Sequence, residues 1–190
     1  ILKRTMGKQD HYAAAYGDLN VLTFHVNENV TVEPVFYSSE VHQKIASNLL
    51  LFYTTKKRNA SEILKVQDQV TPNKLSVLRQ MKNLVEPLRE VILSGENLHR
   101  VGEILHENWE LKRSLTDLTS SKEIDKCYLK ALQAGAIGGK LLGAGGGGFL
   151  IFYVEPDKHD AVIKALSSLY HLKFRFDTSG TRITYYDQST

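Results

Sequence analysis

The pattern of apolar and polar residues predicts strands followed by helices along most of the chain. Between residues 20 and 37, β-branched and aromatic residues dominate, and the polar break at 27–29 indicates a hairpin with a longer turn. The continuous apolar run at 48–55 has the length of a strand buried on both faces. Apolar residues then recur at steps of three and four, which predicts helices, the second of them broken at Pro87. The expected helices cover residues 60–69, 75–92, 98–112 and 122–133.

The two ends of the chain carry shorter elements. An alanine-rich segment from His11 to Tyr16 that stops at Gly17 is typical of a short helix with a glycine cap. Towards the C-terminus we expect an apolar strand, an amphipathic helix and a final hairpin around Ser179 and Gly180. These last elements cover residues 149–154, 157–170, 172–176 and 181–186. Helices combined with antiparallel strand pairs define an α+β fold.

The segment from Gly143 to Gly148 is the most unusual stretch of the chain, because five of its six residues are glycine. Glycine loses more backbone freedom on folding than any other residue, so such a loop is costly to order. The cost is usually offset where backbone approaches backbone closely, or where backbone N–H groups bind an anion such as phosphate. Lys140 adds a positive charge three residues upstream. The alternative is a tight turn between a helix and a strand.

A second unusual segment, from Gly7 to Tyr12, contains Asp10 at the start of the first predicted helix. An aspartate beside Lys8 and His11 has the ingredients of a general base, because the positive helix end and the lysine both favour its ionised form. The ordinary alternative is a helix N-cap, a frequent role of aspartate in front of a helix. Local sequence alone favours the cap.

Composition narrows the classes of protein to which the chain can belong. Its 190 residues are 42% hydrophobic and 24% charged, as in an ordinary globular protein with a real core. The net charge of +3 is small and the basic and acidic residues are interleaved, so nucleic acid is not an expected partner. The single cysteine, Cys127, excludes an intrachain disulfide and a cysteine-based zinc site, and no metal ligand is predicted. Since no apolar run reaches the ~18 residues of a membrane helix, we expect a cytoplasmic protein without a membrane partner.

The glycine-rich segment does not match the common nucleotide-binding patterns, because it lacks the Gly-Lys-Ser/Thr end of a P-loop and precedes a strand. Taken with the Asp10 segment, however, it resembles the GHMP kinase superfamily, which includes galactokinase, homoserine kinase and mevalonate kinase. Residues 140–149, Lys-Leu-Leu-Gly-Ala-Gly-Gly-Gly-Gly-Phe, resemble its third, C-terminal signature. Residues 7–17, Gly-Lys-Gln-Asp-His-Tyr-Ala-Ala-Ala-Tyr-Gly, resemble the segment with the catalytic aspartate of its sugar kinases. Residues 105–113 and the likeness over nearly the whole chain point to kinases of D-glycero-D-manno-heptose 7-phosphate, which phosphorylate O1.

The resemblance implies a fold and a set of site residues. The α+β fold would consist of the end of a ribosomal-S5-like domain, residues 1–37, followed by a ferredoxin-like C-terminal domain with added helices, residues 38–190. Asp10 would be the base that activates the attacking sugar hydroxyl, since phosphoryl transfer needs one such carboxylate. Lys8, Gln9 and Tyr16 would lie near the sugar. Trp109 and Lys112 would lie near the sugar phosphate. The phosphate or nucleotide loop would contain Lys140, Gly143, Ala144, Gly145 and Gly146.

Two of these assignments have ordinary alternatives. Trp109 is equally expected as a core residue, because it lies on the apolar stripe of its predicted helix. Lys112 is equally expected as a solvated surface residue. His11 and Asp18 depart from the residues that close relatives usually carry, Gln and Gly. The identity of the sugar therefore stays open.

The resemblance also implies ATP and Mg²⁺ as cofactors and a sugar phosphate as small-molecule partner. The family's second signature, Pro-x-x-x-Gly-Leu-Gly-Ser-Ser-Ala, holds the ATP phosphates and supplies a magnesium ligand, and the 190 residues do not contain it. Because the chain begins at Ile1 and runs almost directly into the Asp10 segment, we expect it to be the back part of a longer protein. Most ligands of ATP and Mg²⁺ would then lie upstream, and the chain alone would be inactive.

Two further functions stay open. The chain can belong to another GHMP sugar kinase, related to galactokinase or fucokinase, or it can be a non-catalytic module that binds a metabolite. The sequence predicts no oligomeric state.

Overall fold

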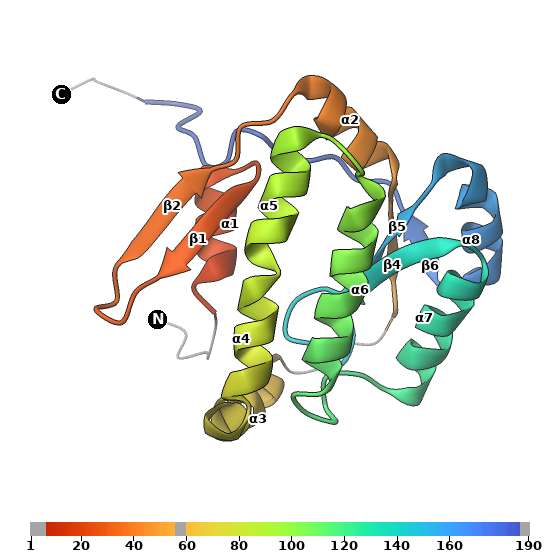
Figure 1. The fold of residues 1–190 in the computed structure, drawn as a ribbon, viewed down its shortest axis with the longest axis horizontal. Coiled ribbons are helices and arrows are strands. Elements are labelled where there is room, and N and C mark those ends of the chain that lie inside the picture. The colour runs from red at the N-terminus through yellow and green to blue at the C-terminus, as the bar shows by residue number, and fades with distance from the viewer. Residues whose placement is uncertain (1–6, 56–59, 187–190) are drawn as a thin grey trace. The chain divides into compact units, whose positions relative to one another are not determined.

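The structure is a computed structural model that describes residues 7–55 and 60–186. The described residues divide into two compact units (Figure 1). The sheet unit consists of the described residues between 37 and 174, and the hairpin unit of residues 7–36 together with 175–186. The first division falls next to the predicted domain boundary at residue 37, whereas residues 175–186 group with the N-terminal segment.

Both units contain helices and antiparallel strands, so the mixed helix-and-sheet class expected from the sequence is confirmed at that level. The helices of the sheet unit are α2 (Ser39–Ser47), α3 (Ala60–Val70), α4 (Leu75–Asn83), α5 (Val85–Ser94), α6 (His99–Arg113), α7 (Lys122–Gln133) and α8 (His159–Ala165), with 3₁₀ turns η1 (Thr71–Asn73) and η2 (Pro156–Lys158). Its strands are β3 (Leu49–Tyr53), β4 (Ala136–Leu141), β5 (Phe149–Val154) and β6 (Tyr170–Leu172). The hairpin unit contains α1 (Gln9–Tyr16), β1 (Asn20–Phe24) and β2 (Val30–Pro34).

The strands of the sheet unit form one antiparallel sheet in the order β4-β5-β3-β6. Leu50 faces Phe152 across β3 and β5, and Leu141 faces Leu150 across β4 and β5. Helices α6 and α7 pack against β4, and α8 packs against α7. The core between these elements consists of Leu50, Phe52, Trp109, Ile124, Tyr128, Ala131, Ala136, Leu141, Leu150, Phe152, Val154, Val162 and Leu166.

Helix α6 and strand β4 approach one another unusually closely, because glycine lies on both sides of the contact. A Cβ atom added to Gly138 of β4 would lie 2.1 Å from the carbonyl oxygen of Gly102 of α6 and 2.7 Å from the Cβ of His106. A Cβ atom on Gly102 would lie 2.9 Å from side-chain atoms of Ile137. The absence of side chains at these two positions therefore sets the distance between helix and sheet.

Most of the predicted helices are confirmed. The predicted helix over residues 75–92 is interrupted, but at Leu84 and not at Pro87. It becomes α4 and α5, and Pro87 lies in the first turn of α5, where its missing N–H costs no helical hydrogen bond. Gly95 ends α5 in the left-handed conformation, with φ 68°. The predicted strands at 48–55 and 149–154 and the hairpin at 20–37 are also present.

Three predictions about local structure were wrong or incomplete. The segment Ala136–Leu141 is strand β4, which periodicity did not indicate, so the glycine-rich loop joins two strands and not a helix to a strand. The helix expected over 157–170 is shorter, with α8 ending at Ala165. The final hairpin is absent among the described residues, because residues 175–186 form no strand and bond instead to the end of α1. Helix α2 was not predicted.

The hairpin unit is held together by residues from both ends of the chain. The N–H of Asp18 donates to the carbonyl of Asp177 at 2.8 Å, and the N–H of Thr181 donates to the carbonyl of Ala15 at 3.0 Å. A Cβ atom on Gly17 would lie 2.3 Å from the nitrogen of Gly180, so the two glycines allow the segments to touch. The C-terminal segment thus completes the surroundings of α1.

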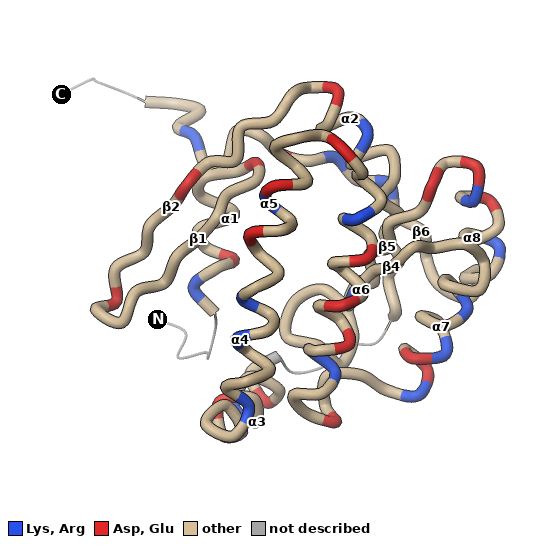
Figure 2. The backbone as a smooth tube through the Cα atoms, viewed as in Figure 1, with Lys and Arg blue, Asp and Glu red and all other residues tan. Residues whose placement is uncertain are grey.

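Charged residues of both signs are mixed along the helices of the sheet unit, as Figure 2 shows for α4 to α8. Within residues 7–55 and 60–186, no helix combines the length and the apolar character needed to cross a membrane.

We predict that Gly138→Ala destabilises the protein, because the added methyl group would overlap the Gly102 carbonyl. Overpacking of this kind costs about 1–3 kcal/mol in the free energy of unfolding, measurable by urea denaturation. Gly7→Ala is the matched control, since its methyl group would meet no atom within 4 Å. Equal unfolding midpoints for the two variants would contradict the close contact of α6 with β4.

Candidate functional site

The glycine-rich loop is the turn of the β4–β5 hairpin in the sheet unit. The hairpin closes at its base through the N–H of Leu142, which donates to the carbonyl of Phe149 at 2.8 Å. Gly145 lies against the backbone of Thr119, and a Cβ atom there would be 2.9 Å from the Thr119 carbonyl oxygen. Its φ of 115° also suits glycine alone. The loop is therefore built on close backbone packing, one of the two explanations considered for so many glycines.

Side chains from three different elements bind the carbonyl groups of the loop. Lys112 of α6 donates from Nζ to the Gly143 carbonyl, and Gln67 of α3 donates from Nε2 to the Ala144 carbonyl at 3.1 Å. Thr54, directly after β3, donates to the Gly148 carbonyl at 3.0 Å and accepts from its N–H at 3.0 Å. These bonds hold the loop at three of its six carbonyl groups.

Two N–H groups of the loop are also used, that of Gly148 by Thr54 and that of Gly146 by Thr119. The N–H of Gly146 donates to the Thr119 carbonyl at 2.8 Å. Among the described residues, nothing accepts from the N–H groups of Gly143, Ala144 and Gly145, although Gly145 is buried. Three consecutive free N–H groups in a glycine-rich turn are suited to an anion, because each supplies a donor and a partial positive charge.

Two lysines lie beside this loop. Lys140 of β4 donates from Nζ to the Oδ1 atom of Asn108 at 2.5 Å, and Asn108 lies one helical turn before Lys112 on α6. Burial, and then the positive charge of Lys140, lowers the pKa of Lys112 to about 8. Burial also lowers the pKa of Lys140. Within the described part of the chain, neither ammonium group has a carboxylate within ion-pair distance.

A buried polar network supports the helix and strand that carry these groups. The Tyr128 hydroxyl donates to the Gly139 carbonyl at 3.0 Å and lies 2.8 Å from Nδ1 of His106. Because the hydroxyl has one proton, Nδ1 of His106 is the donor in the second bond. Burial raises the pKa of Tyr128, so the hydroxyl stays protonated. The network links α6, α7 and β4 directly beneath the lysines.

Trp109 belongs to the core, as its alternative interpretation expected. Its side chain has 0% exposed surface and its ring lies 5.9 Å from that of Tyr128, measured between centroids. Its Nε1 atom has no hydrogen-bond partner in the described part of the chain. The full burial of Trp109 fits the packing interpretation, and its proximity to the sugar phosphate stays a prediction.

The remaining predicted residues lie on α1 of the hairpin unit. Asp10 is in the first turn of the helix, after the N-cap residue Lys8, so the interpretation of Asp10 as the N-cap was wrong. The ammonium group of Lys8 pairs with Glu28 in the β1–β2 turn, and does not hold the Asp10 carboxylate as the sequence suggested. Asp10 is exposed and makes no hydrogen bond or ion pair with the described residues. Tyr16 is 54% exposed and stacks on Tyr12 with ring centroids 6.2 Å apart.

The structure therefore brings together one group of predicted residues, Lys112, Lys140 and the loop from Gly143 to Gly146, in the sheet unit. Lys8, Gln9, Asp10 and Tyr16 form a second group on α1. The sequence analysis missed Asn108, Gln67, Thr54 and Thr119, which contact the first group. Of these four residues, only Asn108 could have been predicted from the sequence. It lies four residues before Lys112, and this spacing places both side chains on the same face of the helix.

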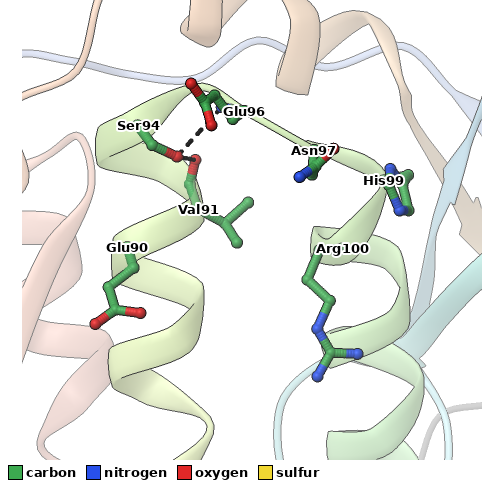
Figure 3. A pocket seen from close by; sticks show the side chains of 7 residues that line it. All are labelled: Glu90, Val91, Ser94, Glu96, Asn97, His99 and Arg100. Atoms are coloured by element: carbon green, nitrogen blue, oxygen red, sulfur yellow. Dashed lines mark hydrogen bonds between the residues drawn. The ribbon is translucent and has the colours of Figure 1, made fainter.

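A hollow of about 520 Å³ lies at the turn between α5 and α6 (Figure 3). It is lined by Glu90, Val91, Ser94, Glu96, Asn97, His99 and Arg100, none of which was predicted as a site residue. The guanidinium group of Arg100 is already paired with Glu103 at 2.8 Å. Separately, the described residues contain no group of three His, Cys, Asp or Glu side chains able to hold a metal ion.

Comparisons with known proteins agree with the resemblance drawn from the sequence. Residues 81–172 match the family model described as GHMP kinases C terminal. The chain is 30% identical over 165 residues to D-glycero-alpha-D-manno-heptose 7-phosphate kinase of Campylobacter jejuni, covering 84% of this chain and 48% of that protein. It is 26% identical over 198 residues to galactokinase of Pyrococcus furiosus, covering 88% of this chain and 53% of that protein.

A solved structure shows the same relationship. The crystal structure of a D-glycero-D-manno-heptose 1-phosphate kinase from Bacteriodes thetaiotaomicron superimposes with a TM-score of 0.67 at 25% identity. The match covers 95% of this chain and 50% of that one. The chain thus spans about half the length of the relatives it matches.

We predict that Lys112 makes the stability depend on pH above neutrality. Its pKa is about 8 in the folded protein, against 10.5 for a free lysine, so between these values the unfolded chain holds a proton that the folded chain has released. The free energy of unfolding should therefore rise with pH across this window through Lys112, and this rise should be lost in Lys112→Met.

The measurement is urea denaturation of both proteins at pH 7, 8, 9 and 10. Wild type should gain stability relative to Lys112→Met as the pH increases. Lys126→Met, which removes an exposed lysine of α7, should leave the dependence unchanged. Parallel curves for wild type and Lys112→Met would show that Lys112 titrates normally.

Proposed function

We propose that this chain belongs to the GHMP kinase superfamily and is the C-terminal part of an ATP-dependent sugar kinase. The observation that carries the proposal is the glycine-rich loop. Side chains bind its carbonyls at Gly143, Ala144 and Gly148, and no described residue accepts from the three consecutive N–H groups of Gly143, Ala144 and Gly145, which lie beside Lys112 and Lys140. A kinase needs such donors, because phosphoryl transfer is catalysed mainly by alignment and by stabilisation of negative charge.

We further propose D-glycero-D-manno-heptose 7-phosphate as the substrate, with its anomeric hydroxyl as the acceptor. The heptose 7-phosphate kinase of Campylobacter jejuni and the heptose kinase structure support this choice by their similarity over most of the chain. Galactokinase is similar over a comparable length, so another sugar is the second candidate. The cytoplasmic location belongs to the same proposal.

The topology supports the finer description of the fold. The elements β3, α6, β4, β5, α8 and β6 follow in the order β-α-β-β-α-β, and the sheet order β4-β5-β3-β6 is that of a ferredoxin-like domain. Helices α3, α4, α5 and α7 would be its additions. We propose that residues 1–37 are the end of an S5-like domain and residues 38–190 the ferredoxin-like domain.

In the proposed reaction, the Asp10 carboxylate accepts the proton of the sugar hydroxyl as its oxygen bonds to the γ-phosphorus of ATP. The bond from that phosphorus to the bridging oxygen breaks, and ADP leaves with the bonding electrons. Asp10 suits this role because no described residue occupies its carboxylate. Lys8, Gln9 and Tyr16 on the same helix would orient the sugar. The described residues offer no ligand cluster for Mg²⁺, so we assign no step to it.

We predict that Asp10→Asn, introduced into the complete reading frame, lowers kcat about 10²–10⁴-fold, the usual contribution of a general base. The assay is coupled ADP release with heptose 7-phosphate. Asp160→Asn, which removes an exposed carboxylate from the first turn of α8, is the control and should retain full activity. Undiminished turnover by Asp10→Asn would exclude Asp10 as the base.

We also predict that the purified 190-residue chain does not turn over ATP, because it lacks the Gly-Leu-Gly-Ser-Ser-Ala signature that holds the ATP phosphates in this family. ADP release should stay at the background rate with heptose 7-phosphate, galactose or fucose. The protein from the complete reading frame should be active with one of the three, and the one preferred identifies the sugar. Measurable turnover by the 190-residue chain would contradict the prediction.

The non-catalytic alternative makes a different prediction. A metabolite-binding module would bind a sugar phosphate with no transfer from ATP, even when expressed from the complete reading frame. Sequencing upstream of Ile1 gives the first answer, since the kinase proposal requires the glycine-serine signature there.

A further inference from the structure

The peptide unit between Ala144 and Gly145 lies within the glycine-rich loop, and its two polar groups point in opposite directions. This follows because the peptide is trans and planar, so that its C=O and N–H are antiparallel. The carbonyl accepts from Nε2 of Gln67 on α3 at 3.1 Å. The N–H of Gly145 has no acceptor among the described residues and faces away from α3. The direction of the carbonyl therefore decides on which side of the loop this donor is presented.

Glycine at position 145 also permits the opposite direction of this peptide. A rotation of the peptide plane by about 180° changes mainly ψ of Ala144 and φ of Gly145. The φ of Gly145 would go from 115° to about −65°, and glycine adopts both values readily. The rotated peptide would place a carbonyl oxygen where the N–H now lies, and that oxygen would repel an anion.

Gln67 is the group that selects one of these two directions. Its amide nitrogen donates, so it requires the carbonyl oxygen and not the N–H in front of it. Ile63, at 2% exposure, is the one buried side chain among the described side chains of α3, and Gln67 lies one helical turn later on the same face. Ile63 thus attaches the helix to the core, while Gln67 contacts the loop and fills no core position.

We propose that Gln67 is a positioning residue that holds the Ala144 carbonyl towards α3 and thereby presents the Gly145 N–H on the opposite side, to an anionic oxygen of a ligand. Gln67 acts through the backbone and does not touch the ligand. The inference rests on the proposed function for the identity of the ligand, whereas the direction of the peptide is a property of this chain. An ionised glutamate at position 67 has nearly the same shape but only accepts, so it would favour the rotated peptide.

Amide exchange in the 190-residue chain, followed residue by residue by NMR, tests the direction of the peptide without ATP. In wild type, the Gly145 amide should exchange about tenfold faster than that of Gly146, which donates to the Thr119 carbonyl. In Gln67→Glu, the Gly145 amide should become about tenfold slower than in wild type, because the carboxylate accepts from it. Gln69→Glu places the same charge on an exposed position of α3 and should change nothing. Slow Gly145 exchange in wild type, or equal exchange in Gln67→Glu, would overturn the proposal.

Steady-state kinetics of the protein from the complete reading frame separate positioning from a merely structural role. Gln67→Ala should lower kcat/KM about fivefold for ATP or for the acceptor, whichever the loop contacts, with the melting temperature within about 4 °C of wild type. Gln67→Glu should lower kcat/KM about tenfold further. Gln67→Lys, which restores a donor, should come within about threefold of wild type. Gln69→Glu and Gln69→Lys are the charge controls and should match wild type.

The order of these variants carries the test. A structural role predicts that Gln67→Glu, which preserves the shape, is milder than Gln67→Ala, and that order would overturn the proposal. The exchange experiment needs no turnover. Protection of the Gly145 amide by Gln67→Glu in an inactive protein therefore refutes the kinase and not the role of Gln67. An active kinase in which Gln67→Glu turns over like wild type refutes the role of Gln67 and not the kinase.

Discussion

The contact of the α6 backbone with the β4 backbone at Gly102 and Gly138 is the constraint on which the candidate site depends. Asn108 and Lys112 lie six and ten residues further along the helix, or about 9 and 15 Å at 1.5 Å per residue. Lys140 lies two residues further along the strand, or about 7 Å. Because helix and strand touch at the glycines, side chains that extend from them meet beyond the contact, where Lys140 reaches Asn108. A wider spacing would leave each lysine in water with an ordinary pKa.

The glycine-rich loop is a further product of this arrangement. The glycine residues permit the conformation of the loop but do not select it, because their backbone freedom would allow many other loop conformations as well. Side chains of Gln67, Thr54 and Lys112 bind its carbonyls, and the backbone of Thr119 holds its centre. The elements that supply these groups are separated widely in the sequence. The conformation of the loop follows from this, because both of its ends and its centre are bonded to the rest of the sheet unit, while the N–H groups of Gly143, Ala144 and Gly145 have no acceptor among the described residues.

The elements of the fold and the candidate site could be predicted where a local sequence pattern determines the structure, and not where tertiary contacts determine it. Helices with a regular apolar stripe were predicted well, and Gly95 marked the end of α5 correctly. The interruption signalled by Pro87 lies three residues earlier, at Leu84. Strand β4 was missed, because the sequence Ala-Ile-Gly-Gly-Lys-Leu has two glycines that disfavour strands locally and are required only by the approach of α6. The prediction of the final hairpin was wrong for the opposite reason. Its residues favour strands locally, but in the structure their backbone bonds to the end of α1. For the candidate site, the resemblance predicted Asp10, Lys112 and Lys140, and their roles stay predictions. The partners of Lys8 and of the loop carbonyls depend on tertiary contacts that no local pattern contains.

The bonds from Thr181 to the end of α1 have a consequence for how the protein is made. Thr181 reaches back to Ala14 across 167 residues of sequence, so the hairpin unit is discontinuous along the chain. A ribosome releases residues in order, and domains generally fold as their last segment emerges. The sheet unit, whose residues are consecutive, has all its strands before synthesis ends. Helix α1 is the first described element to be synthesised, yet the end of α1 can pack against Gly180 only after the whole sheet unit has been synthesised.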